Sequence, residues 1–320
     1  MEEIVKKDIR ALDKEALRTF FVTQGQSAFR GNQVYEWLWQ KGAHSFESMT
    51  NISKETRAFL ETHFVINHIR VDQMQRSNDG TIKNAVRLHD NLVVESVLIP
   101  TKTRTTACVS SQVGCSLDCK FCATSRLKRM RNLQPDEIYD QVVAIDQQSR
   151  LYFNRPLSNI VFMGMGEPLM NYNNVLKAIE KITDPEGLAM SPKRIIVSTS
   201  GVPKMIRKMA EDGVKFKLAV SLHSAIDSVR TTIMPFNETF PLKDLGESLV
   251  YWYEKTQRVV TYEYIVWDGI NDKKEDIKSP RKPINIAIWT LAFTDLSRKI
   301  NRRITIISRM RGVCIKRNKE

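Results

Sequence analysis

The sequence predicts an α/β protein with a parallel sheet, open or closed into a barrel, preceded by a small helical domain. From about Thr103, short β-branched segments alternate with longer amphipathic ones, as in strand–helix–strand units. Residues 1–70 have helical periodicity instead. At 320 residues, the chain is long enough for one large domain and a small accessory one.

Residues 1–70 are predicted to form the N-terminal helical domain. Apolar residues recur at helical spacing within Gly31–Gly42, and Ser53 is a suitable N-cap for the next helix. Trp37 and Trp39 are assigned mainly to the core of this domain.

Residues 71–102 are predicted to form a β-hairpin connector. Asn78-Asp79-Gly80 supplies a turn between strands, and His89-Asp90-Asn91 supplies another.

Residues 103–277 are predicted to form the core, in which functional residues should follow the C-terminal ends of strands. Strands are predicted at residues 105–112, 159–165, 194–200, 216–223 and 260–267. Helices are predicted to begin at Pro135 and to cover residues 174–182, 202–210 and 242–255.

Composition argues against a secreted or membrane protein. The N-terminus lacks the apolar core of a signal peptide, and no run of 18 apolar residues occurs, so a cytoplasmic location with reduced thiols is expected. The net charge of +13 is uneven, because Lys278–Glu320 carries twelve Lys/Arg against two acids. The remaining 37 Lys/Arg face 34 acids, so residues 278–320 form an atypical basic tail.

Four of the five cysteines lie between Cys108 and Cys122, which suggests a metal site. Cys115, Cys119 and Cys122 have C-x3-C-x2-C spacing and can bind three irons of a [4Fe–4S] cluster. The fourth iron then stays open to the amino and carboxylate groups of S-adenosylmethionine (SAM), whose reductive cleavage releases a 5′-deoxyadenosyl radical. The alternatives are a disulfide or a zinc site, the zinc completed in space by His223 or Cys108.

Eight segments together resemble the radical SAM adenine-C2 methyltransferases of ribosomal and transfer RNA (the RlmN type), over about residues 15–277. They are FRGNQVYEWLWQKG, VVESVLIP, CVSSQVGCSLDCKFCAT, RNLQPDEIYDQV, FMGMGEPLMNYNNV, STSGVPKM, SLHSA and EYIVWDGIND. An antibiotic-resistance relative that methylates carbon 8 shares two of these motifs, but the SSQVGC form resembles the carbon-2 branch. The family fold is a partial (β/α)6 radical SAM barrel with a small N-terminal helical domain for RNA contact.

The resemblance implies methylation of carbon 2 of an adenine in 23S rRNA, with tRNA as a second candidate substrate. Carbon 2 is electron-poor and its C–H is not acidic, so a radical route is required. In the family, one cysteine accepts a methyl group from SAM, and a second SAM provides the radical that activates this methyl group. The target adenine leaves its stack. A reductant such as flavodoxin or ferredoxin, and a monomeric state, are also expected.

The resemblance assigns two catalytic residues. Glu95 matches the glutamate that removes the proton from carbon 2, and Cys108 matches the cysteine that resolves the protein–RNA adduct through a disulfide. Without the resemblance, Glu95 is better explained as a solvated strand residue and Cys108 as a small buried one.

The resemblance also assigns SAM contacts, with Glu167 suited to the amino group, although His223 alone is more often a satisfied core histidine. The SAM residues are Gly166, Glu167, Ser198, Ser221, Leu222 and His223. Four basic residues after the cysteines are candidates for RNA phosphates or form a solvated basic face. They are Arg126, Lys128, Arg129 and Arg131.

Residues 278–320 depart from the family, because they lack its last-strand asparagine motif and its methyl-accepting cysteine motif. Cys314 lies in Gly-Val-Cys-Ile-Lys, which shares nothing with that motif. One hypothesis is a shifted reading frame or sequencing error; the other is a divergent tail with strands at INIAIW and ITIIS that uses Cys314. Two alternative functions follow: a SAM-cleaving protein defective in methylation, and a non-catalytic zinc-containing RNA-binding protein.

Overall fold

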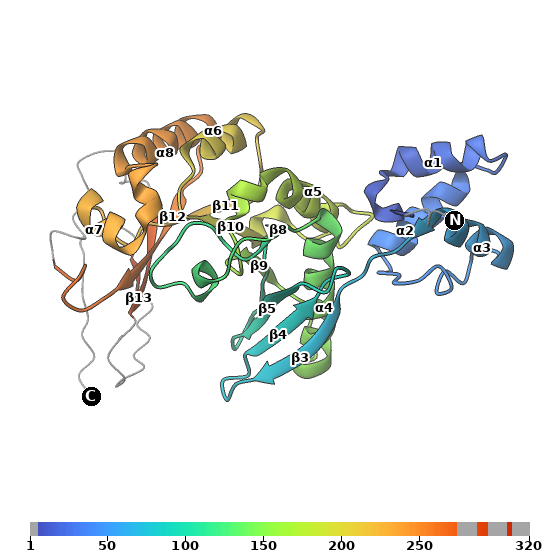
Figure 1. Cartoon of the computed structure of the whole chain (residues 1–320), viewed down its shortest axis with the longest axis horizontal. Helices are drawn as coiled ribbons and strands as arrows, with labels where there is room; N and C mark the ends of the chain where they lie inside the picture. The colour runs from blue at the N-terminus through green and yellow to red at the C-terminus, as the bar shows by residue number, and fades with distance from the viewer. Residues whose placement is uncertain (1–5, 274–286, 294–305, 309–320) are drawn as a thin grey trace. The chain divides into compact units, whose positions relative to one another are not determined.

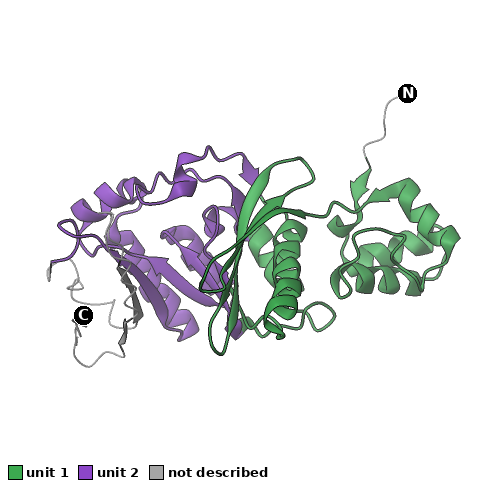
Figure 2. Ribbon diagram, turned by 90° about the horizontal axis from the view of Figure 1, so that it is seen from below, with its two compact units in different colours: residues 1–110, 133–160, 173–192 green, residues 111–132, 161–172, 193–320 purple. Residues whose placement is uncertain are grey.

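The computed structural model describes residues 6–273, 287–293 and 306–308 (Figure 1). The chain divides into two compact units, shown in Figure 2. Unit 1 comprises residues 1–110, 133–160 and 173–192, and unit 2 comprises residues 111–132, 161–172 and 193–320. The predicted α/β class with a mostly parallel sheet is confirmed. The domain limits expected at about residues 70, 102 and 277 remain a prediction.

Unit 1 begins with three helices, as the sequence predicts. They are α1 (Lys14–Thr23), α2 (Phe29–Trp39) and α3 (Lys54–His63), accompanied by the short parallel pair β1 (Lys7–Asp8) and β2 (Phe64–Val65). Ser53 is the N-cap of α3, since its Oγ accepts a hydrogen bond from the Thr56 N–H at 3.2 Å. A Cβ at Gly31 would lie 2.6 Å from the backbone nitrogen of Arg18, so glycine lets α2 approach α1 closely.

The two tryptophans of α2 have different environments. Trp39 is 2% exposed and packs edge-to-face on Tyr139 at 5.1 Å, as expected of a core residue. Trp37 is only partly buried, and Lys41 lies 4.4 Å above its ring. Residues two apart on a helix point to nearly opposite faces, so the core assignment holds for Trp39 alone.

Unit 1 continues with an antiparallel sheet that α4 covers (Figure 1). Its strands are β3 (Arg70–Arg76), β4 (Ile82–Arg87), β5 (Val93–Pro100) and β6 (Thr105–Cys108); the helices that follow are α4 (Pro135–Phe153) and α5 (Tyr172–Thr183). Both predicted turns are present, with φ of +84° at Gly80 and +66° at Asn91. Along β5, Val94 and Leu98 point inward and Glu95 points outward.

Unit 2 is built on parallel strands in the order β10, β11, β12 and β13, with β14 antiparallel at the edge. The strands are β10 (Ile195–Thr199), β11 (Lys217–Ser221), β12 (Val260–Val266), β13 (Ala287–Phe293) and β14 (Ile306–Ser308), and β9 (Asn159–Phe162) has residues in both units. The helices are α6 (Pro203–Glu211), α7 (Asp227–Ile233) and α8 (Leu242–Thr256). A separate antiparallel pair consists of β7 (Gln112–Val113) and β8 (Arg131–Asn132).

Two elements differ from the sequence prediction. The strand expected over residues 105–112 ends at Cys108, because Ser111 and Gln112 both donate their backbone N–H to the Met165 carbonyl instead. Helix α7 was not predicted, because its β-branched residues have low helix propensity. In the tail, the backbone of β13 continues the sheet beside β12, consistent with the hypothesis that the tail contains strands.

Candidate functional site

The cysteine loop joins β7 to β8 within unit 2. Cys115, Cys119 and Cys122 are reduced thiols. The loop packs on the end of α7, where Leu117 and Cys119 share an apolar cluster with α7 side chains and Trp267. The Ser125 hydroxyl donates to the Cys119 and Cys122 carbonyls, each at 2.7 Å. The thiols therefore occupy a loop that packing and hydrogen bonds hold in position.

These thiols are poor anions without a cation nearby. Burial, together with the neighbouring thiols, raises the pKa of Cys119 to about 12. Burial also raises the pKa of Cys115 above its usual value. A metal ligand must be a thiolate, so iron or another cation has to supply the missing positive charge.

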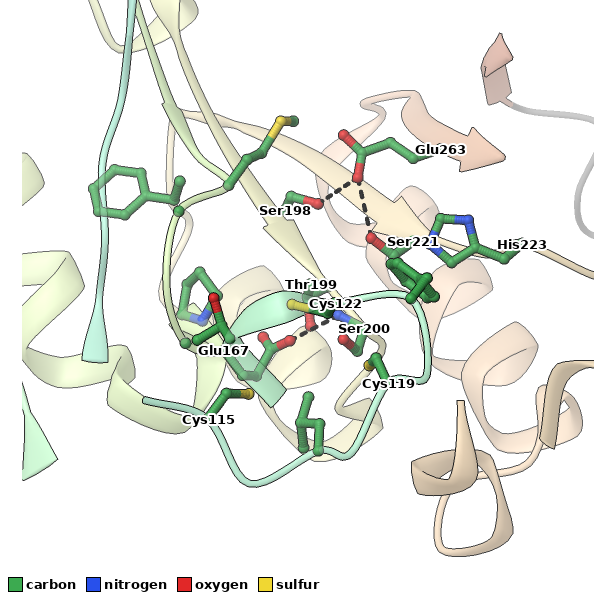
Figure 3. Close-up of a pocket in the computed structure, with 18 of the residues that line it drawn as sticks. Cys115, Cys119, Cys122, Glu167, Ser198, Thr199, Ser200, Ser221, His223 and Glu263 are labelled. Carbon is green, nitrogen blue, oxygen red and sulfur yellow. Dashed lines mark hydrogen bonds between the residues drawn. The ribbon is translucent and has the colours of Figure 1, made fainter. Parts of the chain in front are cut away.

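One cavity of about 340 Å³ gathers most of the residues predicted to bind the cluster and SAM (Figure 3). The three cysteines lie on one wall, and residues at the C-terminal ends of β10 and β11 lie on another. The predicted residues that line it are Cys115, Cys119, Cys122, Gly166, Glu167, Ser198, Ser221 and His223. This position agrees with the expectation for parallel α/β proteins.

Glu167 contributes a buried carboxylate to the cavity wall. Its two oxygens accept backbone hydrogen bonds from Leu169 at 3.0 Å and Ser200 at 2.7 Å. Burial raises the pKa of Glu167 despite these bonds. A ligand ammonium group would therefore be a favourable partner for this carboxylate.

Glu263 is a second buried carboxylate, which the sequence analysis missed. In the parallel register it lies directly across from Ser221, and one of its oxygens accepts hydrogen bonds from the Ser198 hydroxyl at 2.7 Å and the Ser221 hydroxyl at 3.1 Å. Burial raises its pKa. The three side chains form one polar group across β10, β11 and β12 (Figure 3).

His223 is 2% exposed and has a buried donor for a ligand. Its Nδ1 accepts the Ile265 N–H at 3.2 Å, which leaves the proton on Nε2. Among the described residues, Nε2 is buried without a hydrogen-bond partner. Burial, with the nearby Arg230, lowers the pKa of His223 to about 3, so the ring is neutral near pH 7. The rings of Phe121 and Trp267 flank it at 4.8 and 5.8 Å.

The remaining predicted residues lie outside this lining. Leu222 is buried beside it, and its N–H donates to the Glu263 carbonyl at 3.0 Å. Glu95 and Cys108 belong to unit 1, where half-exposed Glu95 contacts Lys83 at 2.5 Å and Cys108 is buried opposite Val97. Cys314 lies outside the described residues.

The basic residues after the cysteines are solvent-accessible. Arg126, Lys128 and Arg129 are exposed, and Arg131 is partly exposed. Exposed Leu127 and Met130 are interleaved with them. Such a surface suits contact with phosphate groups, and also suits simple solvation.

Three cysteines around one cavity fit a polynuclear cluster. A four-iron cluster binds each thiolate through a different iron, so the sulfurs must surround a volume rather than meet at one point. Within the ranges the structure describes, no group of three or more His, Cys, Asp or Glu side chains is arranged to hold a metal ion as it stands.

In the same ranges, no helix has the length and apolar character of a membrane span.

Comparisons with known proteins agree with this geometry. The family model described as "Ribosomal RNA large subunit methyltransferase N-terminal domain" matches residues 7–66, and the model of the radical SAM superfamily matches residues 109–279. A "Probable dual-specificity RNA methyltransferase RlmN" from Christiangramia forsetii is 77% identical over 86% of this chain and 78% of its own length.

More distant relatives give the same result. The "Dual-specificity RNA methyltransferase RlmN" of Geotalea uraniireducens is 43% identical over 85% of this chain and 78% of its own length. A crystal structure of a radical SAM methyltransferase from Sphaerobacter thermophilus superimposes with a TM-score of 0.82 at 33% identity, covering 89% of this chain and 84% of that one.

Proposed function

The chain belongs to the RlmN family of radical SAM RNA methyltransferases, and from this premise we propose that it methylates carbon 2 of a specific adenine in 23S rRNA and, as a second substrate, in tRNA. One observation carries the proposal. The three thiols of the C-x3-C-x2-C motif line the same cavity as the buried carboxylates of Glu167 and Glu263. The RNA specificity and the use of two SAM molecules follow from the family resemblance.

Within this proposal, Cys115, Cys119 and Cys122 hold a [4Fe–4S] cluster. When bound, the cluster supplies the electron that cleaves SAM to a 5′-deoxyadenosyl radical. The chain's own contribution is to exclude water, since Cys119 is 7% exposed and packs among apolar side chains. A dry site protects a reactive radical from side reactions.

The opposite wall is proposed to bind SAM. The Glu167 carboxylate accepts hydrogen bonds from the amino group of SAM, and Gly166 lets the backbone approach it closely. Ser198, Ser221 and Leu222 belong to the same wall, oriented through Glu263. Nε2 of His223 donates to an acceptor atom of the cofactor, which satisfies a donor that is otherwise buried without a partner.

Two residues of unit 1 are proposed to act on the base. Glu95 takes the proton from carbon 2, and Cys108 resolves the adduct by disulfide formation with a methyl-carrying cysteine. That role requires Cys314, because the sequence has no other unassigned cysteine. By the same resemblance, a flavodoxin or ferredoxin supplies the electron, and the enzyme works as a cytoplasmic monomer. The exposed basic residues after the cysteines contact RNA phosphates.

Complementation tests the proposal directly. A strain lacking 2-methyladenosine in its 23S rRNA and tRNA is given this exact chain, and the nucleosides are measured by mass spectrometry. We expect 2-methyladenosine to be restored, C115A to abolish it together with iron binding, and C108A to abolish it while retaining iron. Iron should be retained because Cys108 is not one of the three cysteines of the C-x3-C-x2-C motif and belongs to unit 1, whereas those cysteines belong to unit 2.

Purified protein separates the alternatives. Anaerobic reconstitution should give about four irons per chain and 5′-deoxyadenosine on reduction with SAM. Zinc without iron would favour the non-catalytic RNA-binding protein. Iron and SAM cleavage without restored 2-methyladenosine would leave a methylation-defective radical SAM protein.

A further inference from the structure

Arg230 is a fully buried cation that the reaction described above does not use. It lies in α7 and is 0% exposed. Its guanidinium donates to four neutral oxygens: Ser200 O at 2.5 Å, Asn237 Oδ1 at 2.6 Å, Leu222 O at 3.1 Å and Ser221 O at 3.2 Å. A buried guanidinium is costly unless its donors are satisfied, so this arrangement has to be explained.

Three of these oxygens are backbone carbonyls at the ends of β10 and β11. Ser200 and Ser221 also line the cavity. Arg230 therefore fixes the backbone of the wall that carries the Ser198–Ser221–Glu263 group. The planar guanidinium donates hydrogen bonds to both strand ends at once. A lysine ammonium is a single point of charge and would satisfy fewer of these carbonyls.

The helix that carries Arg230 also supports the thiols. Ile233 and Met234 pack against Leu117 and Cys119, and the Lys120 N–H donates to the Ile233 carbonyl at 3.0 Å. One short helix thus contacts both the cysteine loop and the strand ends, and it carries a permanent positive charge.

Electrostatics couple this charge to the thiols. Burial lowers the pKa of Arg230 to about 10, and the Cys119 and Asp227 charges act against that shift. The guanidinium is therefore protonated near pH 7. Arg230 precedes Ile233 by about one turn of α7, and Ile233 packs in the same apolar cluster as Cys119, so the charge lies close to the cysteine loop. Because the guanidinium is buried, where the effective dielectric constant is low, it interacts with nearby charges more strongly than an exposed cation would.

We propose that Arg230 is a positioning residue whose buried cation raises the reduction potential of the cluster held by Cys115, Cys119 and Cys122. The inference rests on the proposed cluster. Reduction adds one electron, and the added negative charge is favoured by a neighbouring cation that water does not screen. The electron comes from an external low-potential reductant.

The test is an anaerobic redox titration of the full chain with dithionite, followed by electron paramagnetic resonance of the reduced cluster. R230Q should lower the midpoint potential of the cluster by about 59 mV. For one electron, this is about a tenfold change in the reduction equilibrium. R230K keeps the charge and should stay close to the wild type, even where it weakens SAM binding. An unchanged midpoint in iron-loaded R230Q, or equal shifts in R230K and R230Q, would overturn the proposal.

A second variant covers the case in which R230Q does not retain the cluster. Asp227 is the acid that acts on Arg230, so D227N removes a nearby negative charge and should shift the midpoint to higher potential. An unchanged midpoint in D227N would show that single charges on α7 do not affect the potential, which would overturn the proposal. The iron content is measured separately. Wild-type protein that binds no iron would contradict the proposed function rather than the role of Arg230.

Discussion

Gly166 illustrates at the residue scale why the turn after β9 requires glycine. Its φ is +92°, and a Cβ there would lie 2.4 Å from the Gln112 Cβ and 2.9 Å from the Gln112 nitrogen. The Gln112 side chain cannot move away freely, because its Oε1 accepts the Glu167 N–H at 2.9 Å. The close approach therefore holds Glu167 at the cavity wall.

G166A is expected to destabilise the protein by about 3 kcal/mol, from backbone strain together with overpacking against Gln112. The measurement is the free energy of unfolding in urea. G213A is the matched control, because Gly213 also has a positive φ, +62°, but no atom within 4 Å of its Cβ position. The control should lose about 1 kcal/mol from strain alone. Equal losses in the two variants would contradict a role for the Gln112 contact.

The sequence identifies some site residues and misses others for a physical reason. The cysteines and Glu167 lie in short motifs whose spacing reflects their chemistry, so the local sequence is informative. Glu263 matters because the strand register sets it opposite Ser221, forty-two residues earlier in the chain. Arg230 matters because its fork reaches carbonyls of two other strands. Local spacing carries no information about such partners.

At the element scale, a buried ion cluster joins the segment before α1 to α4. Arg10 is 7% exposed and contacts Asp140 at 2.7 Å, Asp136 at 3.1 Å and Asp8 at 3.7 Å. Three carboxylates thus share one guanidinium. Burial, with the like charges of Asp8 and Asp140, raises the pKa of Asp136 to about 7, although Arg10 acts in the opposite direction.

This shift makes stability depend on pH with a defined sign. An unfolded aspartate titrates near pH 3.9, so between about pH 4 and pH 7 the native state binds more protons than the unfolded state. The free energy of unfolding should therefore fall as pH rises through this window. D136N removes the titration, and its stability relative to wild type should improve by on the order of 2 kcal/mol from about pH 5 to pH 8.

Chemical unfolding across this pH range measures the effect. E254Q changes an exposed acid on α8 and should give a profile parallel to that of the wild type. A D136N profile that also runs parallel to the wild type would contradict the raised pKa of Asp136.

The elements that sequence patterns recover are the long, strongly periodic ones. Helix α4 was predicted from its Pro135-Asp136-Glu137 start, and α8 from a helical pattern over several turns. Helix α7 was missed because seven residues rich in β-branched side chains have no such signal, and packing on the cysteine loop stabilises it instead. The strand predicted over residues 105–112 is interrupted for a similar reason, a tertiary contact with the Met165 carbonyl.

At the scale of the whole molecule, the thiols and the opposite wall belong to the same compact unit. Every residue that lines the cavity falls within unit 2, whereas the helices α1–α3 and the sheet β3–β6 belong to unit 1. A bound metal stabilises the part of a protein that its ligands and their neighbours form. Loss of iron should therefore affect the two units differently.

Hydrogen exchange of iron-loaded and chelator-treated protein measures this difference. Removing iron should speed amide exchange in β10, β11 and α7 at least about tenfold, because the free energy of cluster binding then no longer stabilises the unit that holds the thiols. Exchange in β4 and α4 of unit 1 should change little. C119S, purified without iron, should already show the fast pattern and should not respond to the chelator. Equal acceleration in both units would mean that the cluster stabilises the chain as one cooperative body. Exchange unaffected by iron would mean that the thiol loop is ordered by its packing on α7 alone.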